Sequence, residues 1–386
     1  MIYFDHAASS WPKPEGVAEA VAQAINEYAA NPGRGGHQLA RQANAKIRET
    51  RALLAQFFNI QDPRNLIFCS NATHALNQAI QGIVWEAGDR VISTSYEHNS
   101  VRRPLEYIRE EYGVEVDYIQ VQDNGSLSLE ELESSLDENT KLIAVTHVSN
   151  VTGAILPLAE ISVIARKKNI PLLVDASQSA GFVPLDVDEL GISLLAFPGH
   201  KGLYGPQGTG ALYIAPDLNL TPLLHGGTGS HSELKEQPGE RPARYESGTL
   251  NTPGIAGLGA GVKFLLERGM ETIFKEEQEL TIYALTQLSE VQGVQIYGPG
   301  LGEERAPVIA FNIEGIASQE LAHILDQHYS IATRAGLHCS PLGHESIKTE
   351  QIGAVRISFG LFNTKQEVDQ LIVALNEIRD GMLGFV

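Results

Sequence analysis

Short apolar runs alternate along the chain with stretches that have the periodicity of amphipathic helices. The runs that predict β-strands are Leu66–Cys69, Arg90–Ser93, Val116–Val121, Leu142–His147, Pro171–Ala176, Leu194–Phe197 and Thr209–Ile214. After the first of them, apolar residues recur at helical spacing, at Ala72, Ala75, Leu76, Ala79, Ile80 and Ile83. This alternation predicts an α/β fold, in which a mostly parallel, buried sheet carries helices on both faces.

The pattern changes after the last of these strands. A polar stretch rich in glycine and proline extends from about His225 to Gly254, and a loop of that length is usually functional or disordered. A long helical pattern begins near Ile255, and two further strands are predicted at Val308–Ile313 and Val355–Phe359. The spacing of Thr364 and Glu367 predicts a capping box at the start of a last helix. A chain of 386 residues is long enough for two domains, so this second part is predicted to be a smaller α+β unit.

The composition is typical of a globular protein with an acidic surface. Hydrophobic residues make up 43% of the chain, and 47 acidic residues against 28 basic ones give a net charge of −19. Because this charge repels polyanions, neither nucleic acid nor an anionic membrane is expected as a partner. No apolar run approaches the ~20 residues of a membrane span, and the start of the chain lacks the features of a signal peptide. The two cysteines do not indicate a disulfide framework, so the cytoplasm is the expected compartment.

Lys201 is the first candidate for chemistry. It follows His200 in a glycine-rich turn between two apolar strands. A buried lysine is costly unless its charge is used or removed, and burial favours the neutral amine that forms a Schiff base. The alternative is an ordinary surface lysine on a tight turn.

Two further features suggest a bound cofactor. Asp175 ends the apolar run Pro171–Ala176, and ligands of open α/β sheets bind at the carboxyl ends of strands. An acid at that place can pair with a cationic ring nitrogen, although it can also be the N-cap of the next helix. The segment Ser70–Thr73 opens the helix that follows the first strand, and a helix N-terminus binds anions such as phosphate.

Together and in this order, these features resemble the class V aminotransferase family of fold type I pyridoxal-phosphate enzymes, and within it the group II cysteine desulfurases. The motifs that carry the resemblance are Tyr3–Ala8, Asn31–His37, Glu97–His98, Ser149–Gly153, Val174–Gln178, Gly199–Lys201, Glu246–Thr252 and Thr333–Cys339. The resemblance implies a large domain at residues 15–255 with a mostly parallel seven-stranded sheet, and a small α+β domain formed by residues 1–14 and 256–386. It also implies a homodimer whose subunits share their active sites.

The resemblance implies pyridoxal 5'-phosphate as the cofactor and no metal ion. Lys201 would hold the cofactor as a Schiff base, Asp175 would pair with the pyridine nitrogen, and His98 would stack on the ring and help to move protons. The other implied contacts are Asn150 and Gln178 near the phenolic oxygen, Ala72, Thr73 and His200 at the phosphate, and Thr249 at the phosphate of the neighbouring subunit's cofactor.

Arg356 is the candidate for binding the substrate. It lies in an apolar strand, where an unpaired charge is costly, and arginine binds a carboxylate through two parallel hydrogen bonds. The resemblance implies that it holds the α-carboxylate of L-cysteine, with Ala8, Asn150 and Arg334 nearby. A structural ion pair is the alternative for this arginine.

Cys339 lies in a loop sequence, whereas Cys69 lies in a buried strand pattern and is expected to be inert. Thiolate is the reactive form of cysteine, and His338, Arg334 and Arg356 are the nearby cations expected to favour it. The resemblance implies that Cys339 receives sulfur from L-cysteine as a persulfide, leaving L-alanine, and then passes the sulfur to an acceptor protein. Iron–sulfur cluster assembly, tRNA thiolation and cofactor synthesis all use such sulfur.

The sequence departs from the family pattern at the phosphate. Pro198 stands where the family usually has a serine that binds the phosphate, and Gly202 is an additional glycine after the lysine. The turn at Asn71–His74 reads Asn-Ala-Thr-His in place of Gly-Thr-Thr-Glu. These differences indicate a divergent branch.

Other functions share part of this residue set. A C–S lyase that releases pyruvate, or an aminotransferase, would keep Lys201, Asp175 and His98 without needing Cys339. A selenocysteine lyase would use the same residues as a desulfurase. A sulfur-carrier scaffold without enzymatic activity is the non-enzyme alternative, supported only by Pro198 and the altered phosphate turn.

Overall fold

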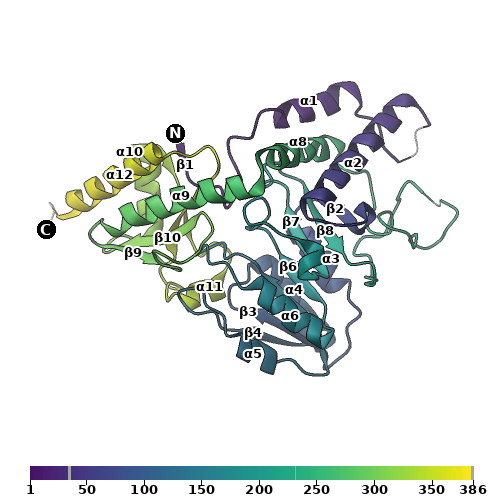
Figure 1. Ribbon diagram of the computed structural model, residues 1–386, viewed down its shortest axis with the longest axis horizontal. Coiled ribbons are helices and arrows are strands. Elements are labelled where there is room, and N and C mark those ends of the chain that lie inside the picture. The colour runs from purple at the N-terminus through teal and green to yellow at the C-terminus, as the bar shows by residue number, and fades with distance from the viewer. Residues whose placement is uncertain (34–35, 231, 384–386) are drawn as a thin grey trace.

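The first seven predicted strands form one sheet in the computed structural model, which describes residues 1–33, 36–230 and 232–383 (Figure 1). The strands are β2 (Leu66–Cys69), β3 (Arg90–Thr94), β4 (Glu115–Ile119), β5 (Thr140–Thr146), β6 (Leu172–Asp175), β7 (Leu194–Pro198) and β8 (Gly210–Ile214). Their order is β2-β8-β7-β6-β5-β3-β4; β8 runs antiparallel to both of its neighbours, β2 and β7, and all other neighbouring pairs are parallel. The prediction of a mostly parallel sheet is confirmed, with each strand end within two residues of its expected position.

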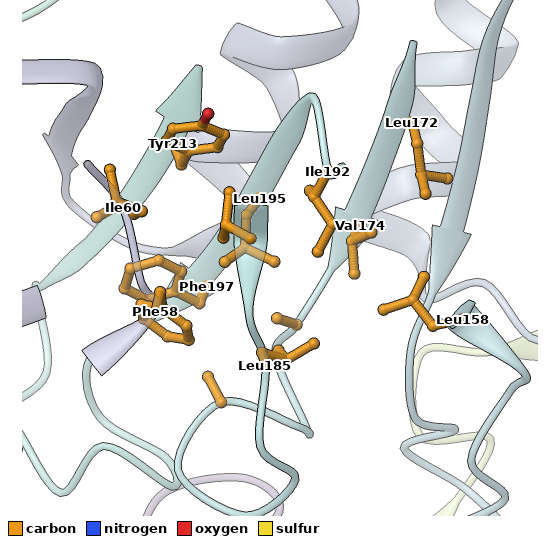
Figure 2. Packing of buried hydrophobic residues seen from close by; sticks show 14 of the residues in the cluster. Phe58, Ile60, Leu158, Leu172, Val174, Leu185, Ile192, Leu195, Phe197 and Tyr213 are labelled. Atoms are coloured by element: carbon orange, nitrogen blue, oxygen red, sulfur yellow. The ribbon is translucent and has the colours of Figure 1, made fainter. Parts of the chain in front are cut away.

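Helices cover both faces of this sheet. They are α1 (Val17–Glu27), α2 (Gln38–Phe57), α3 (Ala72–Gln81), α4 (Asn99–Tyr112), α5 (Leu129–Ser134), α6 (Leu158–Lys168), α7 (Val187–Leu190) and α8 (Thr252–Arg268). Successive side chains of a strand point to opposite faces. Leu195 and Phe197 of β7 accordingly pack on the face of Phe58, at the end of α2 (Figure 2). Ala196 packs on the other face, with Leu76 of α3.

The second unit contains a four-stranded antiparallel sheet of order β12-β13-β10-β9. Its strands are β9 (Val294–Tyr297), β10 (Val308–Ile313), β12 (Arg334–Gly336) and β13 (Ala354–Ser358), and its helices are α9 (Met270–Ser289), α10 (Ser318–Tyr329), α11 (Pro341–Ser346) and α12 (Lys365–Leu383). The start of the chain joins this unit, because β1 (Ile2–Tyr3) pairs with β11 (Ile331–Ala332). Phe4 is fully buried among its apolar side chains.

The long helix α9 connects the two units (Figure 1). Leu258 and Leu265 of the preceding helix α8 belong to the core of the seven-stranded sheet, as does Ile273 at the start of α9. Leu280 and Leu288, further along α9, belong to the core of the second unit. We therefore propose that the boundary between the domains lies after α8, and not at residue 255 within that helix.

The connections agree in part with the predictions. The capping box is confirmed, since the Thr364 backbone N–H donates to Glu367 Oε2 at 2.8 Å and the Glu367 N–H donates to Thr364 Oγ1 at 3.3 Å. The described residues of the polar stretch 225–251 contain no helix or strand. Cys339 itself lies outside helices and strands, as predicted, and α11 begins two residues after it. Among the described residues, no helix is long and apolar enough to cross a membrane.

Candidate active site

The carboxyl ends of β3, β5, β6 and β7 lie at one edge of the sheet, so the loops that follow them surround a common space. A cavity of about 180 Å³ lies there. It brings together every predicted cofactor residue except Thr249, and it is lined by Asn71, Ala72, Thr73, His98, Ser100, Thr146, Asn150, Asp175, Ser177, Gln178, Pro198, His200 and Lys201.

Lys201 and Asp175 have complementary electrostatic environments. Burial lowers the pKa of the Lys201 amine to about 8, against the smaller opposing effect of the Asp175 carboxylate. Asp175 is 3% exposed, and burial raises the pKa of its carboxyl group, while a hydrogen bond from the Ser177 backbone N–H (2.9 Å) opposes that shift. The site therefore holds a lysine that loses its proton near neutral pH, beside a buried acid.

His98 enters the cavity from the start of α4, where it is the N-cap residue. Its Nδ1 accepts a hydrogen bond from the Ser100 backbone N–H at 3.0 Å. Burial and the nearby charge of Lys201 lower the pKa of His98 to about 4. A neutral imidazole with its proton on Nε2 therefore lines the cavity.

The opposite end of the cavity suits an anion. Asn71 is the N-cap of α3, and the hydroxyls of Thr73 and Ser100 are 2.8 Å apart beside the free N–H groups of that helix start. His200 Nδ1 is buried and has no hydrogen-bond partner among the residues that the structure describes. Pro198 adds no donor, and Ser100 is a hydroxyl that the sequence had not indicated.

A glycine is needed at position 202 because a larger residue does not fit there. A Cβ atom at this position would lie 2.3 Å from the Ala180 carbonyl oxygen, because the turn that carries Lys201 passes directly against the backbone of Ala180 and Gly181. We expect Gly202→Ala to destabilise the fold by about 1–3 kcal/mol and to weaken cofactor binding, since the turn has to move. Urea denaturation and cofactor titration measure both effects. Gly239→Ala is the control, because its Cβ would meet nothing within 4 Å; equal stability of the two variants would contradict this explanation.

Arg356 lies beside the cavity and is 1% exposed. Its Nη2 contacts Asp5 Oδ1 at 2.9 Å, and its Nη1 donates to the Asn150 carbonyl oxygen at 2.9 Å. The ion pair that was the alternative for this arginine is therefore present. The buried Nε has no partner within the described part of the chain, so the guanidinium retains a free donor. Asp5 was not among the predicted site residues.

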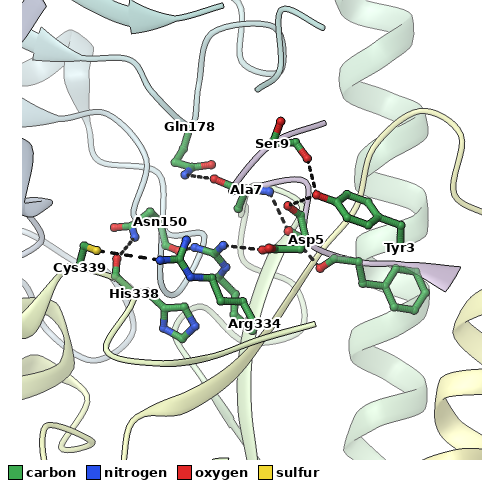
Figure 3. Close-up of polar contacts among 12 residues, drawn as sticks. Tyr3, Asp5, Ala7, Ser9, Asn150, Gln178, Arg334, His338 and Cys339 are labelled. Atoms are coloured by element: carbon green, nitrogen blue, oxygen red, sulfur yellow. Dashed lines mark hydrogen bonds and ion pairs between the residues drawn. The ribbon is translucent and has the colours of Figure 1, made fainter. Parts of the chain in front are cut away.

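Cys339 lies outside the cavity on an exposed loop that is attached to the cavity wall. Asn150 Nδ2 donates to the His338 carbonyl oxygen at 2.8 Å (Figure 3). The Asn99 N–H donates to the Cys339 carbonyl oxygen at 2.8 Å. Arg334 Nη2 lies 4.0 Å from the Cys339 sulfur. This arginine therefore places a cation next to the thiol.

His338 and Cys69 are both buried, which decides the protonation state of each side chain. His338 was expected to act as a cation, but burial lowers its pKa to about 2, so that prediction is wrong. Cys69 was expected to be inert, which agrees with its place in β2, where burial raises the pKa of its thiol.

Thr249 and Ala8 do not line the cavity at Lys201. Thr249 borders a separate cavity of about 1010 Å³ together with Asn31 and Arg48. Ala8 lies in the turn after β1, where its N–H donates to the Asp5 carbonyl oxygen at 3.0 Å. The roles given to these residues stay predictions.

A parallel sheet whose strand ends surround a lysine, an acid and an anion-binding helix start defines a fold type I cofactor site. The sequence matches the family Aminotransferase class-V over residues 2–371, and the chain belongs to that family. The family is pyridoxal-phosphate dependent, and the resemblance found in the sequence is confirmed.

Several similar proteins carry a more specific name than the family does. A probable cysteine desulfurase of Pyrococcus abyssi is 35% identical over 385 residues, covering 98% of this chain and 94% of the relative. The apo structure of the cysteine desulfurase from Thermococcus onnurineus NA1 has a TM-score of 0.93 at 34% identity, covering 98% of this chain and 95% of that one. A cysteine desulfurase from Escherichia coli has a TM-score of 0.89 at 27% identity, covering 98% and 94% of the two chains.

Proposed function

We propose that this protein is a cysteine desulfurase that converts L-cysteine to L-alanine and takes the sulfur onto Cys339. One observation carries the proposal. Asn150 lines the cavity that contains Lys201 and Asp175, and the same side chain is bonded to the loop of Cys339. A residue of the cofactor site is thus bonded directly to the loop of an exposed thiol, which a lyase or an aminotransferase would not require.

The residues of the cavity fit pyridoxal phosphate. The unpartnered Nδ1 of His200 and the N–H groups at the start of α3 are suited to its phosphate, together with the hydroxyls of Thr73 and Ser100. Lys201 would hold the aldehyde carbon, and Asp175 would pair with the ring nitrogen. When bound, the cofactor withdraws electrons from the α-carbon of the substrate.

The substrate would be held by Arg356, whose free Nε and fixed guanidinium plane offer donors to the α-carboxylate. The Cys339 thiolate, beside the Arg334 cation, attacks the sulfur of the bound cysteine. A sulfur–sulfur bond forms while the carbon–sulfur bond of the substrate breaks. The electron pair of the broken bond stays on the β-carbon, which takes up a proton to give alanine.

The same proposal includes a homodimer, an acceptor protein for the sulfur, and the cytoplasm as the compartment. Thr249 lines a separate cavity and not the Lys201 cavity of its own chain, which supports a homodimer in which it serves the neighbouring subunit. The exposure of Cys339 supports delivery of sulfur to an acceptor protein. The described cysteines are both free, which fits the reducing cytoplasm.

The pKa of Lys201 predicts how cofactor loading depends on pH. Only the neutral amine attacks an aldehyde, and a pKa of about 8 leaves ~10% of the amine neutral at pH 7. The rate of covalent cofactor attachment should therefore rise about tenfold from pH 7 to pH 9 and then level off. Stopped-flow absorbance after mixing cofactor-free protein with pyridoxal phosphate measures this rate. A rate that keeps rising beyond pH 10 would show an ordinary lysine.

Product analysis tests the function directly. Cofactor-loaded protein is incubated with L-cysteine and a reductant, and alanine, sulfide and pyruvate are quantified. Alanine and sulfide in equal amounts are expected, because each turnover leaves one sulfur on Cys339 for the reductant to release. Pyruvate in place of alanine would replace the proposal with a C–S lyase, and turnover of selenocysteine alone would replace it with a selenocysteine lyase.

A further inference from the structure

Two buried histidines lie behind the sulfur-accepting loop and have no part in the mechanism above. His338 Nδ1 and His344 Nε2 are 3.2 Å apart, and their rings are stacked with an interplanar angle of 12°. His344 Nδ1 is 2.7 Å from Thr349 Oγ1. His338, His344 and Thr349 are 4%, 0% and 1% exposed, so together they form a chain of hydrogen bonds closed to solvent.

This series of hydrogen bonds ends at His338, the residue that directly precedes Cys339. His338 and Cys339 have φ angles of 50° and 59°, so two successive residues that are not glycine adopt the left-handed conformation. Side chains with a Cβ rarely adopt it, and such strain persists only where surrounding contacts impose it. The position of the thiol therefore depends on the groups that hold this pair of residues.

Contacts hold the loop from two sides. On the side of the large sheet, the backbone carbonyls of His338 and Cys339 accept from Asn150 and Asn99, and Ser340 Oγ donates to the Glu97 carbonyl oxygen at 3.2 Å. On the other side, the His338 ring is bonded to His344 in α11. Burial lowers the pKa of His344 to about 4, so the two rings share a hydrogen bond between neutral groups and do not repel each other.

We propose that His344 is a positioning residue for sulfur transfer, which acts through His338 to keep Cys339 in its left-handed conformation. The inference rests on the proposed desulfurase function and deepens it. Without His344, the buried Nδ1 of His338 loses its partner, and the loop can relax to an ordinary backbone conformation that carries the sulfur atom away from the substrate. Thr349 fixes the orientation of the His344 ring in turn.

The test compares His344→Ala, His344→Gln and Thr349→Val with His323→Ala, a control at an exposed histidine of α10. For His344→Ala, kcat for alanine formation should fall about 10²-fold, as expected for misplacement of a reacting group. KM for L-cysteine and the cofactor absorbance should not change, because Arg356 and Lys201 are untouched. Mass spectrometry after a single turnover should find the Cys339 persulfide reduced in step with kcat.

His344→Gln should recover most of kcat, since its amide can bond to the His338 ring, and Thr349→Val should show a smaller loss than His344→Ala. Thermal unfolding midpoints are measured first, and kcat is compared at a temperature at which every variant is folded. A His344→Ala protein with the kcat of His323→Ala would overturn the inference while leaving the desulfurase function intact. Equal losses in His344→Ala and His344→Gln at full cofactor occupancy would also overturn it. If the unaltered protein forms neither alanine nor persulfide, the proposed function fails first.

Discussion

The Lys201→Ala protein is expected to form alanine from L-cysteine about 10²–10⁴-fold more slowly than the unaltered protein. Burial lowers the pKa of the Lys201 amine to about 8. The amine can therefore hold an aldehyde and can also exchange a proton near neutral pH. Removing it leaves Asp175, His98 and the phosphate end of the cavity in place. Pyridoxal phosphate should therefore still bind, but without a covalent link to the chain.

Two measurements separate binding from chemistry in this variant. The absorption spectrum and gel filtration report whether the cofactor is retained, and alanine formation reports the reaction. Lys263→Ala is the matched control, since Lys263 is an exposed lysine of α8. Lys201→Arg extends the test, because arginine keeps a positive charge but cannot become neutral. If Lys201→Arg retained full activity, the role given to a neutral amine would be wrong.

Much of the fold could be predicted because its main sheet is buried on both faces. Strands such as Pro171–Ala176 are then continuous apolar runs, and a polar residue at their end, such as Asp175, is conspicuous. Strands of two or three residues, such as β1 and β12, have too few positions for periodicity to show. The domain boundary at residue 255 stays a prediction, because an apolar helix such as α8 does not reveal from its sequence which of two cores it joins.

The candidate site was predictable where one short segment carries the whole signal. Lys201, Asp175 and the helix start at Ala72 each lie at the end of a strand or within three residues of it, and the structure brings them to one cavity. Contacts between side chains that are far apart in the sequence were not predictable. Asp5 meets Arg356 only because β13 lies beside the first residues of the chain. Ser100 likewise meets Thr73 only because α3 and α4 begin at the same edge.

Replacing Cys339 with serine is expected to abolish sulfur transfer while leaving the cofactor site unchanged. Cys339 lies outside the cavity, so its side chain has no part in binding pyridoxal phosphate there. A serine hydroxyl is nearly isosteric with the thiol, but it is a far weaker nucleophile and cannot form a persulfide. Spectral changes on adding L-cysteine should persist, because substrate binding at Arg356 is retained. Alanine and sulfide should fall by at least ~10³-fold, as for the loss of a covalent nucleophile.

Cys69→Ala provides the matched control, since Cys69 is the other free thiol and lies in the buried strand β2. Persulfide should then be found on Cys339 alone, located by mass spectrometry of peptides from a single turnover. Alanine formation that survives in Cys339→Ser and is lost in Cys69→Ala would show that Cys69, and not Cys339, receives the sulfur. Pyruvate formed equally by all three proteins would mean that the carbon–sulfur bond breaks without a protein thiol. The link between Asn150 and the Cys339 loop would then be structural, because a lyase needs only the cavity that Asn150 lines.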